Sequence, residues 1–340
     1  MAAIRQLIAL GPQWPTVDPF LFCAHHDDTY PAGVHELGPA RDELAGRNIG
    51  SDFAGKDGWN MYHGSIVPGF PQHPHRGFET ISFLRAGVID HADSLGATAR
   101  FGAGDVQWMT AGSGIVHAEM FPLLDDDGPN PLHLFQVWLN LPAADKMVEP
   151  HFSMLWSDTI PVVGGDGVDV TVIAGELAGK RAPAPPPHSW ASRAEADLAL
   201  WHGRMDAGST WELPPARTAE AVRTVYVYRG GTLTVDGEDV PVEHGALLEQ
   251  TTEALTLTAV DDEVCWILLQ GRPIGEPVAQ YGPFVMNTQA EIEQAFADYQ
   301  RTQFGGWPWP SADPNHGPEK GRFALHADGS VDEPAAEVGS

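Results

Sequence analysis

The sequence predicts an all-β protein, and three observations support this prediction. Short runs rich in β-branched and aromatic residues, such as ETISFLRAG, TVYVYRGG and EVCWILLQG, recur along the chain. Its 37 glycines and 29 prolines are spread between these runs. A helical pattern is convincing only near the C-terminal end. Short strands separated by turn residues at this spacing are typical of a β-sandwich or β-barrel.

The two halves of the chain resemble each other weakly. TISFLRAGVIDH from Thr80 aligns with TVYVYRGGTLTV from Thr224 at an offset of 144 residues. FGAGDVQWM aligns with VEHGALLEQ at an offset of 141 residues. Self-similarity at a fixed spacing indicates a repeated structural unit, so a duplicated β-domain is the simplest explanation.

A proline-rich segment divides these halves. RAPAPPPHSWAS, residues 181–192, disfavours helix and central strand and therefore predicts an extended connector. The expected domains are an N-terminal domain with an extended N-terminus, residues 1–180, and a C-terminal domain, residues 193–310.

The C-terminal domain is expected to end in a helix over residues 288–304. Thr288 and Glu291 have the spacing of a capping box, good helix formers follow, and Gly305 ends the run. Residues 311–340 are rich in Pro, Gly, Asp, Glu and Ala, which predicts a flexible acidic tail.

The charge of the chain excludes some partners. With 46 acidic against 19 basic residues the net charge is -27, which repels nucleic acids and anionic membranes. Cys23 and Cys265 lie far apart and form no disulfide pattern. The apolar N-terminal stretch is broken at Gly11 and Pro12, too early for a secretion signal or a membrane span. We therefore expect a cytoplasmic protein without direct nucleic-acid or membrane partners.

Two pairs of residues point to a metal in the first half. His73 and His75 are two residues apart in HPHRGFETISF, as are His117 and Glu119 in IVHAEM. On strands, residues two apart point to the same face, so two neighbouring strands can direct these four side chains to one ion. Three imidazoles and a carboxylate without a thiolate suit Fe(II), Ni, Cu, Mn or Zn.

This set of ligands also leaves room for chemistry. Four protein ligands around an octahedral metal leave two positions for water, substrate or O2. In the second half the offsets place non-ligating residues at the corresponding positions: Arg217, Ala219, Thr258 and Val260. The second domain is therefore expected to hold no metal at an equivalent site.

Four segments of the chain are distinctive: HPHRGFETISFLRAG, GAGDVQWMTAGSGIVHAEM, VWLNLPAADKMVEP and GRPIGEPVAQYGPFVMNT. They resemble segments of the pirin family, bicupin proteins of the cupin superfamily. The resemblance implies two cupin (jelly-roll) β-barrels packed face to face, with a C-terminal α-helix. It also implies one divalent metal in the N-terminal barrel, Fe(II) first, with Ni, Mn, Cu and Zn as alternatives. The family's ligands fall on His73, His75, His117 and Glu119.

The resemblance implies two kinds of function. Similar bacterial proteins have quercetin 2,3-dioxygenase activity, in which O2 cleaves a flavonol with loss of carbon monoxide. We therefore expect a metal-dependent dioxygenase (quercetinase) that acts on a flavonol or related enolisable phenol, with Glu119 binding the metal or accepting the hydroxyl proton. The alternative is a non-enzymatic metal- and redox-sensing regulator that binds a metabolic enzyme or a transcription regulator.

Other residues near these motifs have weaker assignments. Glu79 lies where many cupins place a carboxylate ligand, but it is expected to lie behind the ligands and to orient an imidazole in preference to binding the metal. Arg76 would guide an anionic substrate or form a salt bridge, and Gln107, Trp108 and Met109 would line the pocket or fill the core. The run HHDD, residues 25–28, is interpreted as a solvated loop or capping cluster in preference to a second cation site. The histidines without a paired ligand spacing are expected to be structural: His63, His91, His133 and His151.

Overall fold

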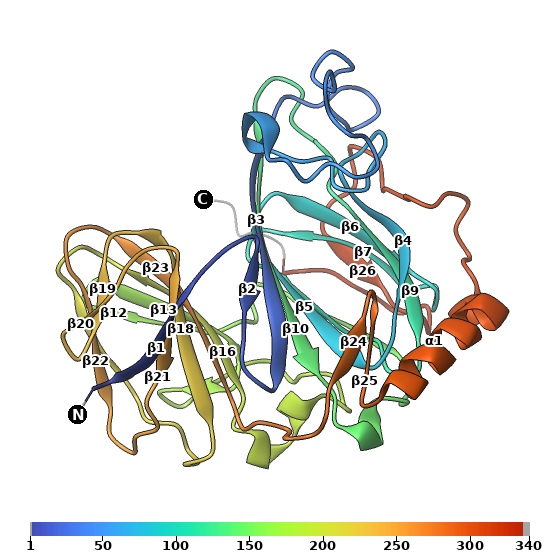
Figure 1. Cartoon of the computed structure of the whole chain (residues 1–340). Helices are drawn as coiled ribbons and strands as arrows, with labels where there is room; N and C mark the ends of the chain where they lie inside the picture. The colour runs from blue at the N-terminus through green and yellow to red at the C-terminus, as the bar shows by residue number, and fades with distance from the viewer. Residues whose placement is uncertain (1, 336–340) are drawn as a thin grey trace. The chain divides into compact units, whose positions relative to one another are not determined.

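The computed structural model describes residues 2–335, which form two compact units (Figure 1). We call the first the histidine unit; it comprises residues 25–136, 143–158 and 276–335. The second unit comprises residues 2–24, 137–142 and 159–275. Each unit has its own sheets and its own hydrophobic core.

The histidine unit contains two sheets. One has the strand order β27-β26-β7-β6-β9-β4, and the other contains β11-β8-β5-β10-β3. Their strands are β3 (Phe20–Tyr30), β4 (Gly69–His75), β5 (Phe78–Ala86), β6 (Val88–Asp93), β7 (Thr98–Gly102), β8 (Val106–Thr110), β9 (Ile115–Met120), β10 (Asn130–Asn140), β11 (His151–Leu155), β26 (Phe323–Leu325) and β27 (Val331–Asp332). Side chains of both sheets, among them Leu84, Phe101 and Leu134, form the core between them.

The second unit repeats this arrangement. A sheet of order β1-β21-β18-β23-β16-β13-β12 and a sheet of order β17-β22-β19-β20 share a core that includes Val225, Leu257 and Trp266. Their strands are β1 (Ile4–Ala9), β12 (Val162–Gly165), β13 (Val168–Ala174), β16 (Ala199–Met205), β17 (Thr210–Leu213), β18 (Val222–Gly230), β19 (Leu233–Val235), β20 (Glu238–Val240), β21 (His244–Leu248), β22 (Leu255–Ala259) and β23 (Val264–Gly271).

The remaining elements are short apart from one helix. Helix α1 (Gln289–Thr302) and the paired strands β24 (Ala279–Tyr281) and β25 (Phe284–Met286) lie in the histidine unit. The others are β2 (Gln13–Pro15), β14 (Glu176–Leu177), β15 (Lys180–Arg181) and the 3-10 turns η1 (Lys56–Gly58), η2 (Ala143–Asp145), η3 (Trp190–Ser192), η4 (Ala194–Ala196) and η5 (Gln303–Gly305). No helix in the described part of the chain is long and apolar enough to span a membrane.

These elements confirm the predicted all-β class with a helix near the C-terminus. The capping box is present, because the Thr288 side chain accepts from the Glu291 backbone N–H and Glu291 accepts from the Thr288 backbone N–H. The internal repeat is visible in the strands: an offset of 144 residues maps both ends of β5 onto the ends of β18. In each unit this strand pairs with an equivalent neighbour, β8 or β21.

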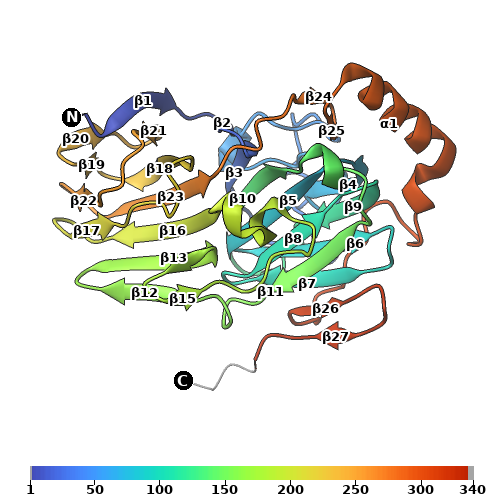
Figure 2. The ribbon, with the colours of Figure 1, turned by 90° about the horizontal axis from the view of Figure 1, so that it is seen from below.

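The units use the chain differently from the predicted boundaries. Strand β1 pairs with β21, so the N-terminal residues complete an edge of the second unit's sheet (Figure 2). Helix α1 lies in the histidine unit, although we expected it in the C-terminal domain. The proline-rich segment 181–192 lies within the second unit. Composition could not show which unit each of these segments joins, because this depends on contacts between segments far apart in the sequence.

The C-terminal segment is a correction to the sequence prediction. In place of a flexible tail from residue 311, β26 pairs with β7 and β27 pairs with β26 (Figure 2). The buried side chain of Arg100 donates to the carbonyl oxygens of Gly317 and Lys320 at 2.7 and 2.8 Å. A buried guanidinium needs such acceptors, which explains why this polar segment is held in place. Residues 336–340 of the predicted tail lie outside the described residues.

Candidate metal centre

A β-bulge in β4 determines which side chains face β9. Phe70 lies opposite Glu119 and His73 lies opposite His117, so β4 uses one residue more than β9 between these two pairs. The additional residue changes the alternation of side chains between the two faces. The backbone N–H of Gln72, within the bulge, donates to the carbonyl of Ala312 at 2.7 Å. No pattern in the sequence predicts this bulge, which changes the direction of the side chains beside the candidate site.

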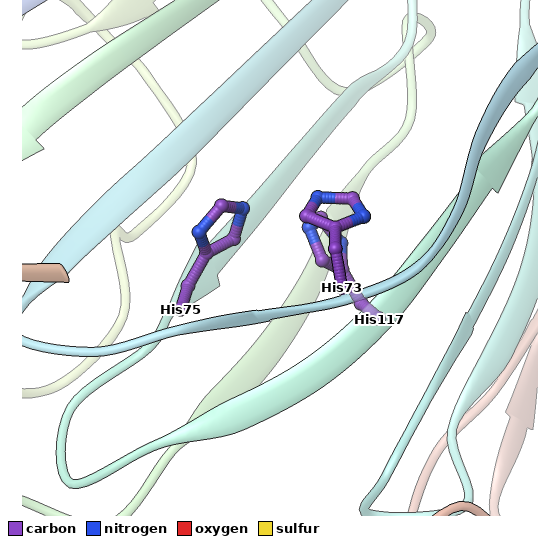
Figure 3. A group of neighbouring side chains, drawn as sticks. All are labelled: His73, His75 and His117. Atoms are coloured by element: carbon purple, nitrogen blue, oxygen red, sulfur yellow. The ribbon is translucent and has the colours of Figure 1, made fainter. Parts of the chain in front are cut away.

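The structure brings together three of the four predicted ligands. One potential ligand atom from each of His73, His75 and His117 lies within 4.8 Å of the others. Figure 3 shows the three rings on one side of the ribbon, two from β4 and one from β9. The centroid distances between the rings are 4.4 to 4.9 Å. This is the convergence that the paired spacing predicts.

Backbone carbonyls fix the tautomers of the two histidines on β4. Nδ1 of His73 lies 2.9 Å from the Pro71 carbonyl oxygen, and Nδ1 of His75 lies 3.3 Å from that of Pro283. A carbonyl oxygen only accepts, so Nδ1 carries the proton in both rings. Nε2 is then the unprotonated nitrogen that can bind a metal, and the carbonyls orient the rings as outer partners of ligating histidines do.

His117 is the most deeply buried of the three histidines and differs from the other two in its hydrogen bonding. Its side chain is 0% exposed, and neither ring nitrogen has a hydrogen-bond partner among the described residues. Burial lowers the pKa of all three histidines, to about 4 for His73 and well below 6.5 for His75 and His117, and the neighbouring imidazoles lower the pKa of the latter two further. The rings are therefore neutral at pH 7, which is the form that binds metals. A buried unpartnered imidazole fits a metal ligand.

Glu119 lies beside this group and is held by hydrogen bonds. Its Oε2 is 3.9 Å from Nε2 of His117, and it is not part of the three-histidine group. Gln136 donates to both carboxylate oxygens, at 2.9 and 3.1 Å, and Ser82 donates to Oε1 at 3.2 Å. Burial raises the pKa of Glu119, and the hydrogen bonds partly oppose this shift. Sequence reasoning missed Ser82 and Gln136, because neither belongs to a motif.

Further unpartnered polar groups lie on the face of the sheet that carries Ser82. Gln107 lies directly opposite Ser82 on the neighbouring strand, and Thr80 precedes Ser82 by two residues, so the three side chains share a face. Gln107 is 0% exposed, and neither its amide oxygen nor its amide nitrogen has a partner among the described residues; the same holds for the Thr80 hydroxyl. Buried polar groups of this kind need a ligand or water.

Two other predicted site residues have partners outside the histidine group. Arg76 donates to Asp298 of α1 at 2.9 Å and to the Ser113 carbonyl at 2.7 Å, and its guanidinium lies 4.5 Å from the centre of the Phe304 ring. This is the salt bridge that we weighed against a substrate-guiding role. Glu79 is buried and accepts from the Thr110 hydroxyl at 2.6 Å.

The remaining predicted residues are buried. Met109 packs with Ala111 and Ile115 in a small core cluster, which favours the core-filling alternative. Trp108 is 0% exposed. His91, expected to be structural, lies opposite Glu119 on β6, and its Nε2 is 3.2 Å from Asp93. The sequence around Trp108, Met109 and His91 did not distinguish a position in the core from one beside the candidate site.

An aromatic group that we did not predict lies next to His73. The centre of the Phe70 ring is 6.2 Å from that of His73 and 5.1 Å from that of Tyr62, on which it stacks. Tyr62 also donates to Asp28 at 2.6 Å and lies 2.7 Å from Nδ1 of His26. Tyr62 comes from the segment GRNIGSDFAGKDGWNMYHG, residues 46–64.

Comparison with known proteins identifies the family. The Pirin family model matches residues 2–139, and the model of the Pirin C-terminal cupin domain matches residues 200–305. Human Pirin is 36% identical over 253 residues, which cover 73% of this chain and 81% of the human protein. The chain belongs to the pirin family. The chain therefore has two cupin domains, whose face-to-face packing stays a prediction of the resemblance.

Two bacterial proteins that this chain resembles carry names that state an activity. A Pseudomonas aeruginosa protein named "Putative quercetin 2,3-dioxygenase" is 39% identical over 240 residues, covering 69% of this chain and 79% of its own. The crystal structure of quercetin 2,3-dioxygenase from Acinetobacter baumannii has a TM-score of 0.70 and 25% identity, covering 89% of this chain and 98% of that one. The chain is therefore a bicupin protein with a putative quercetin 2,3-dioxygenase among its relatives and a quercetin 2,3-dioxygenase among its structural neighbours.

Proposed function

We propose that this pirin is a metal-dependent dioxygenase of the quercetin 2,3-dioxygenase type, which uses O2 to cleave the ring of a flavonol or related enolisable phenol. The observation that supports this most is the group of three neutral imidazoles, in which His75 and His117 are buried and His117 has no hydrogen-bond partner among the described residues. The names of the two bacterial relatives support the type of reaction.

His73, His75 and His117 would hold the ion through their ring nitrogens. We propose Fe(II), with Ni, Mn, Cu and Zn as alternatives, because imidazole binds all of these metals and thiolates are absent from the group. A bound metal supplies Lewis acidity toward the oxygens of the substrate and redox access to O2.

Glu119 would act on the proton of the substrate hydroxyl. Gln136 and Ser82 fix the carboxylate beside His117, so that it can accept this proton without a large movement. The pKa of Glu119, raised by burial, makes the carboxylate a stronger base than one in water. We therefore assign Glu119 as the general base in preference to a fourth metal ligand.

The substrate would bind against groups that the protein leaves without partners. The amide of Gln107 offers both donors and an acceptor, and the Thr80 hydroxyl offers a donor, on the face that carries Ser82. Phe70 and Tyr62 provide stacked aromatic rings beside His73 that suit a flat polyphenol. A substrate with an aromatic plane and several hydroxyls would use both features.

The proposal is tested with quercetin. The protein is stripped of metal, loaded separately with Fe(II), Ni, Mn or Cu, and assayed for O2 uptake and CO release. We expect both with at least one metal, and their loss in His117→Ala. His35→Ala, which changes an exposed histidine, is the matched control and should keep the activity. Absence of turnover with all four metals would contradict the proposal.

The regulatory alternative predicts a different outcome of the same experiment. A protein that only senses redox state would bind the metal through the three histidines but would consume no O2 with quercetin. Metal binding without turnover would therefore favour it. A pull-down with metal-bound and metal-free protein would then show whether a partner distinguishes the two forms.

A further inference from the structure

A second group of potential metal ligands lies on β3 and β10. His25 and Asp27 are two residues apart on β3, and His133 lies on β10, the neighbouring strand in the sheet. One potential ligand atom from each of the three residues lies within 4.8 Å of the others. The run HHDD is therefore part of a strand, which corrects its interpretation as a solvated loop. Its alternating geometry places His25 and Asp27 on the same face.

The distance between the two imidazoles is suitable for a shared ion. Nε2 of His25 lies 3.1 Å from Nε2 of His133. Two nitrogens that bind one zinc ion at about 2.0–2.1 Å lie about 3.3 Å apart at the tetrahedral angle. A hydrogen bond between the two rings would have the same length of 3.1 Å. The carboxylate of Asp27, a third potential ligand at the same place, favours a metal ion over this hydrogen bond.

The surroundings hold the rings and favour a cation. The His25 ring stacks on Phe135 with an interplanar angle of 5° and a centroid distance of 4.6 Å, which limits its rotation. His133 is buried, whereas Asp27 is exposed, so an ion can enter from the side of the carboxylate. The net charge of -27 attracts cations to the molecule.

This group is separate from the three histidines on β4 and β9. Gln136 of β10 bonds to Glu119, and His133 is an odd number of residues away on the same strand, so the two side chains lie on opposite faces of β10. His133 and Phe135 share their face with His25. An ion at this group would therefore bind independently of the first centre.

We propose that His25, Asp27 and His133 form a second metal site for a late first-row divalent cation such as Zn²⁺. Two imidazoles and one carboxylate are a ligand set that zinc commonly takes, with a water molecule as the fourth ligand. The ion would link β3 to β10 and stabilise this edge of the sheet by binding the folded chain only. This site is additional to the proposed dioxygenase centre and does not depend on it.

The test measures zinc binding to the full chain after removal of metals. We expect two equivalents of Zn²⁺ for the wild-type protein by elemental analysis after equilibrium dialysis, and one equivalent for His117→Ala. In the His117→Ala background, Asp27→Asn should weaken the remaining site at least tenfold, and His25→Gln should abolish it. Asp42→Asn, which changes an exposed carboxylate elsewhere, is the control and should leave the affinity unchanged.

Two further readouts separate binding at this site from loss of structure. Zn²⁺ should raise the melting temperature of His117→Ala more than that of the double variant with Asp27→Asn, in which the changed side chain is exposed. Co²⁺ should give the visible absorption of a four-coordinate site in His117→Ala only while His25 is present. The proposal is wrong if His117→Ala binds no zinc, or if Asp27→Asn and His25→Gln both leave its affinity unchanged.

Discussion

At the scale of single residues, the ring of His117 is a feature that folding alone does not explain. A buried polar group without a hydrogen bond costs about 1–3 kcal/mol, and neither nitrogen of this ring has a partner among the described residues. His202 is a contrasting case, since its Nε2 lies 2.7 Å from the Tyr228 hydroxyl in the second unit. The two buried histidines should therefore respond differently to the loss of the ring.

This difference gives a prediction for metal-free protein. His117→Leu should leave the free energy of unfolding unchanged or raise it by up to about 1 kcal/mol, because an unsatisfied polar group is replaced by an apolar one. It should also abolish metal binding by the first centre. His202→Leu should lower the free energy of unfolding by about 1–3 kcal/mol, because it removes the partner of Tyr228. Urea denaturation measures both; equal losses would contradict a metal-binding role for His117.

Glu119→Gln separates the two roles of the carboxylate. As a general base, Glu119 is needed for turnover but not for the metal, so the variant should retain its metal content and lose about 10²–10⁴-fold in kcat. Retention of the hydrogen bond from Gln136 should keep the side chain in place. A variant that loses its metal instead would show that Glu119 is a ligand, as the family pattern implies.

The sequence predicted that the three histidines lie together but not what surrounds them, and their binding of a metal stays a prediction. Paired spacing on strands was sufficient to bring His73, His75 and His117 together, because side chains alternate between the faces of a strand. It could not anticipate the bulge in β4, nor the hydrogen bonds from Ser82 and Gln136 that hold Glu119. These depend on pairings between strands far apart in the sequence.

At the scale of elements, an ion pair with a buried arginine links α1 to the end of β4, in addition to the apolar packing of α1 against β25. Arg76, with a side chain 6% exposed, bonds to Asp298, which also bonds to Arg301. These hydrogen bonds lower the pKa of Asp298 to about 2. Its contribution to stability is therefore present above about pH 4 and is lost as the pH falls toward 2. The same carboxylate thus has one buried and one exposed partner.

Replacing each arginine in turn tests this attachment. Arg76→Met should lower the free energy of unfolding by about 2–3 kcal/mol and speed hydrogen exchange in α1, because a mostly buried carboxylate loses its buried partner. Arg301→Met is the matched control, since this side chain is 70% exposed and its pair is worth less than about 1 kcal/mol. Similar losses in the two variants would show that burial of Arg76 does not matter.

The helix and the C-terminal strands show where local sequence information is sufficient. The capping box of α1 is a local pattern, and the sequence predicted it correctly. The pairing of β26 with β7 is not local, and it brings a polar segment onto a sheet edge through Phe323 and the acceptors for Arg100. Composition therefore indicated a tail where the structure has strands.

At the scale of the whole molecule, the free energy of unfolding should depend on pH through the buried Lys146. Nζ of Lys146 donates to the carbonyls of Gly77 and Val285 at 2.8 and 3.2 Å, and the side chain is 1% exposed. Burial lowers its pKa from 10.5 to about 8, against the opposing effect of Glu276 and Glu291. Above pH 8 the folded protein therefore releases a proton that the unfolded chain still binds.

This shift predicts a rise in stability with pH. Between pH 8 and 9.5 the lysine should contribute an increase of about 2 kcal/mol in the free energy of unfolding. Burial of Cys23 and Tyr62 raises the pKa of each group and shifts the free energy in the opposite direction at higher pH. The quantity to measure is therefore the difference between wild type and Lys146→Met, by denaturation at each pH. A difference that does not change with pH would contradict this assignment.

The two units illustrate what a repeat in the sequence can and cannot predict. The offset of 144 residues located two equivalent strands, β5 and β18, with the same length. It could not show that β1 completes a sheet of the second unit or that α1 belongs to the histidine unit. In both cases the contacts join segments that are far apart in the sequence.

The central claim is that His73, His75 and His117 hold one metal ion in the histidine unit. Anomalous diffraction at the iron edge from crystals of Fe(II)-loaded protein tests it most directly. We predict an anomalous peak about 2.1 Å from one ring nitrogen of each histidine, absent from crystals of His117→Ala. Iron-loaded crystals with no peak among the three rings would contradict the account.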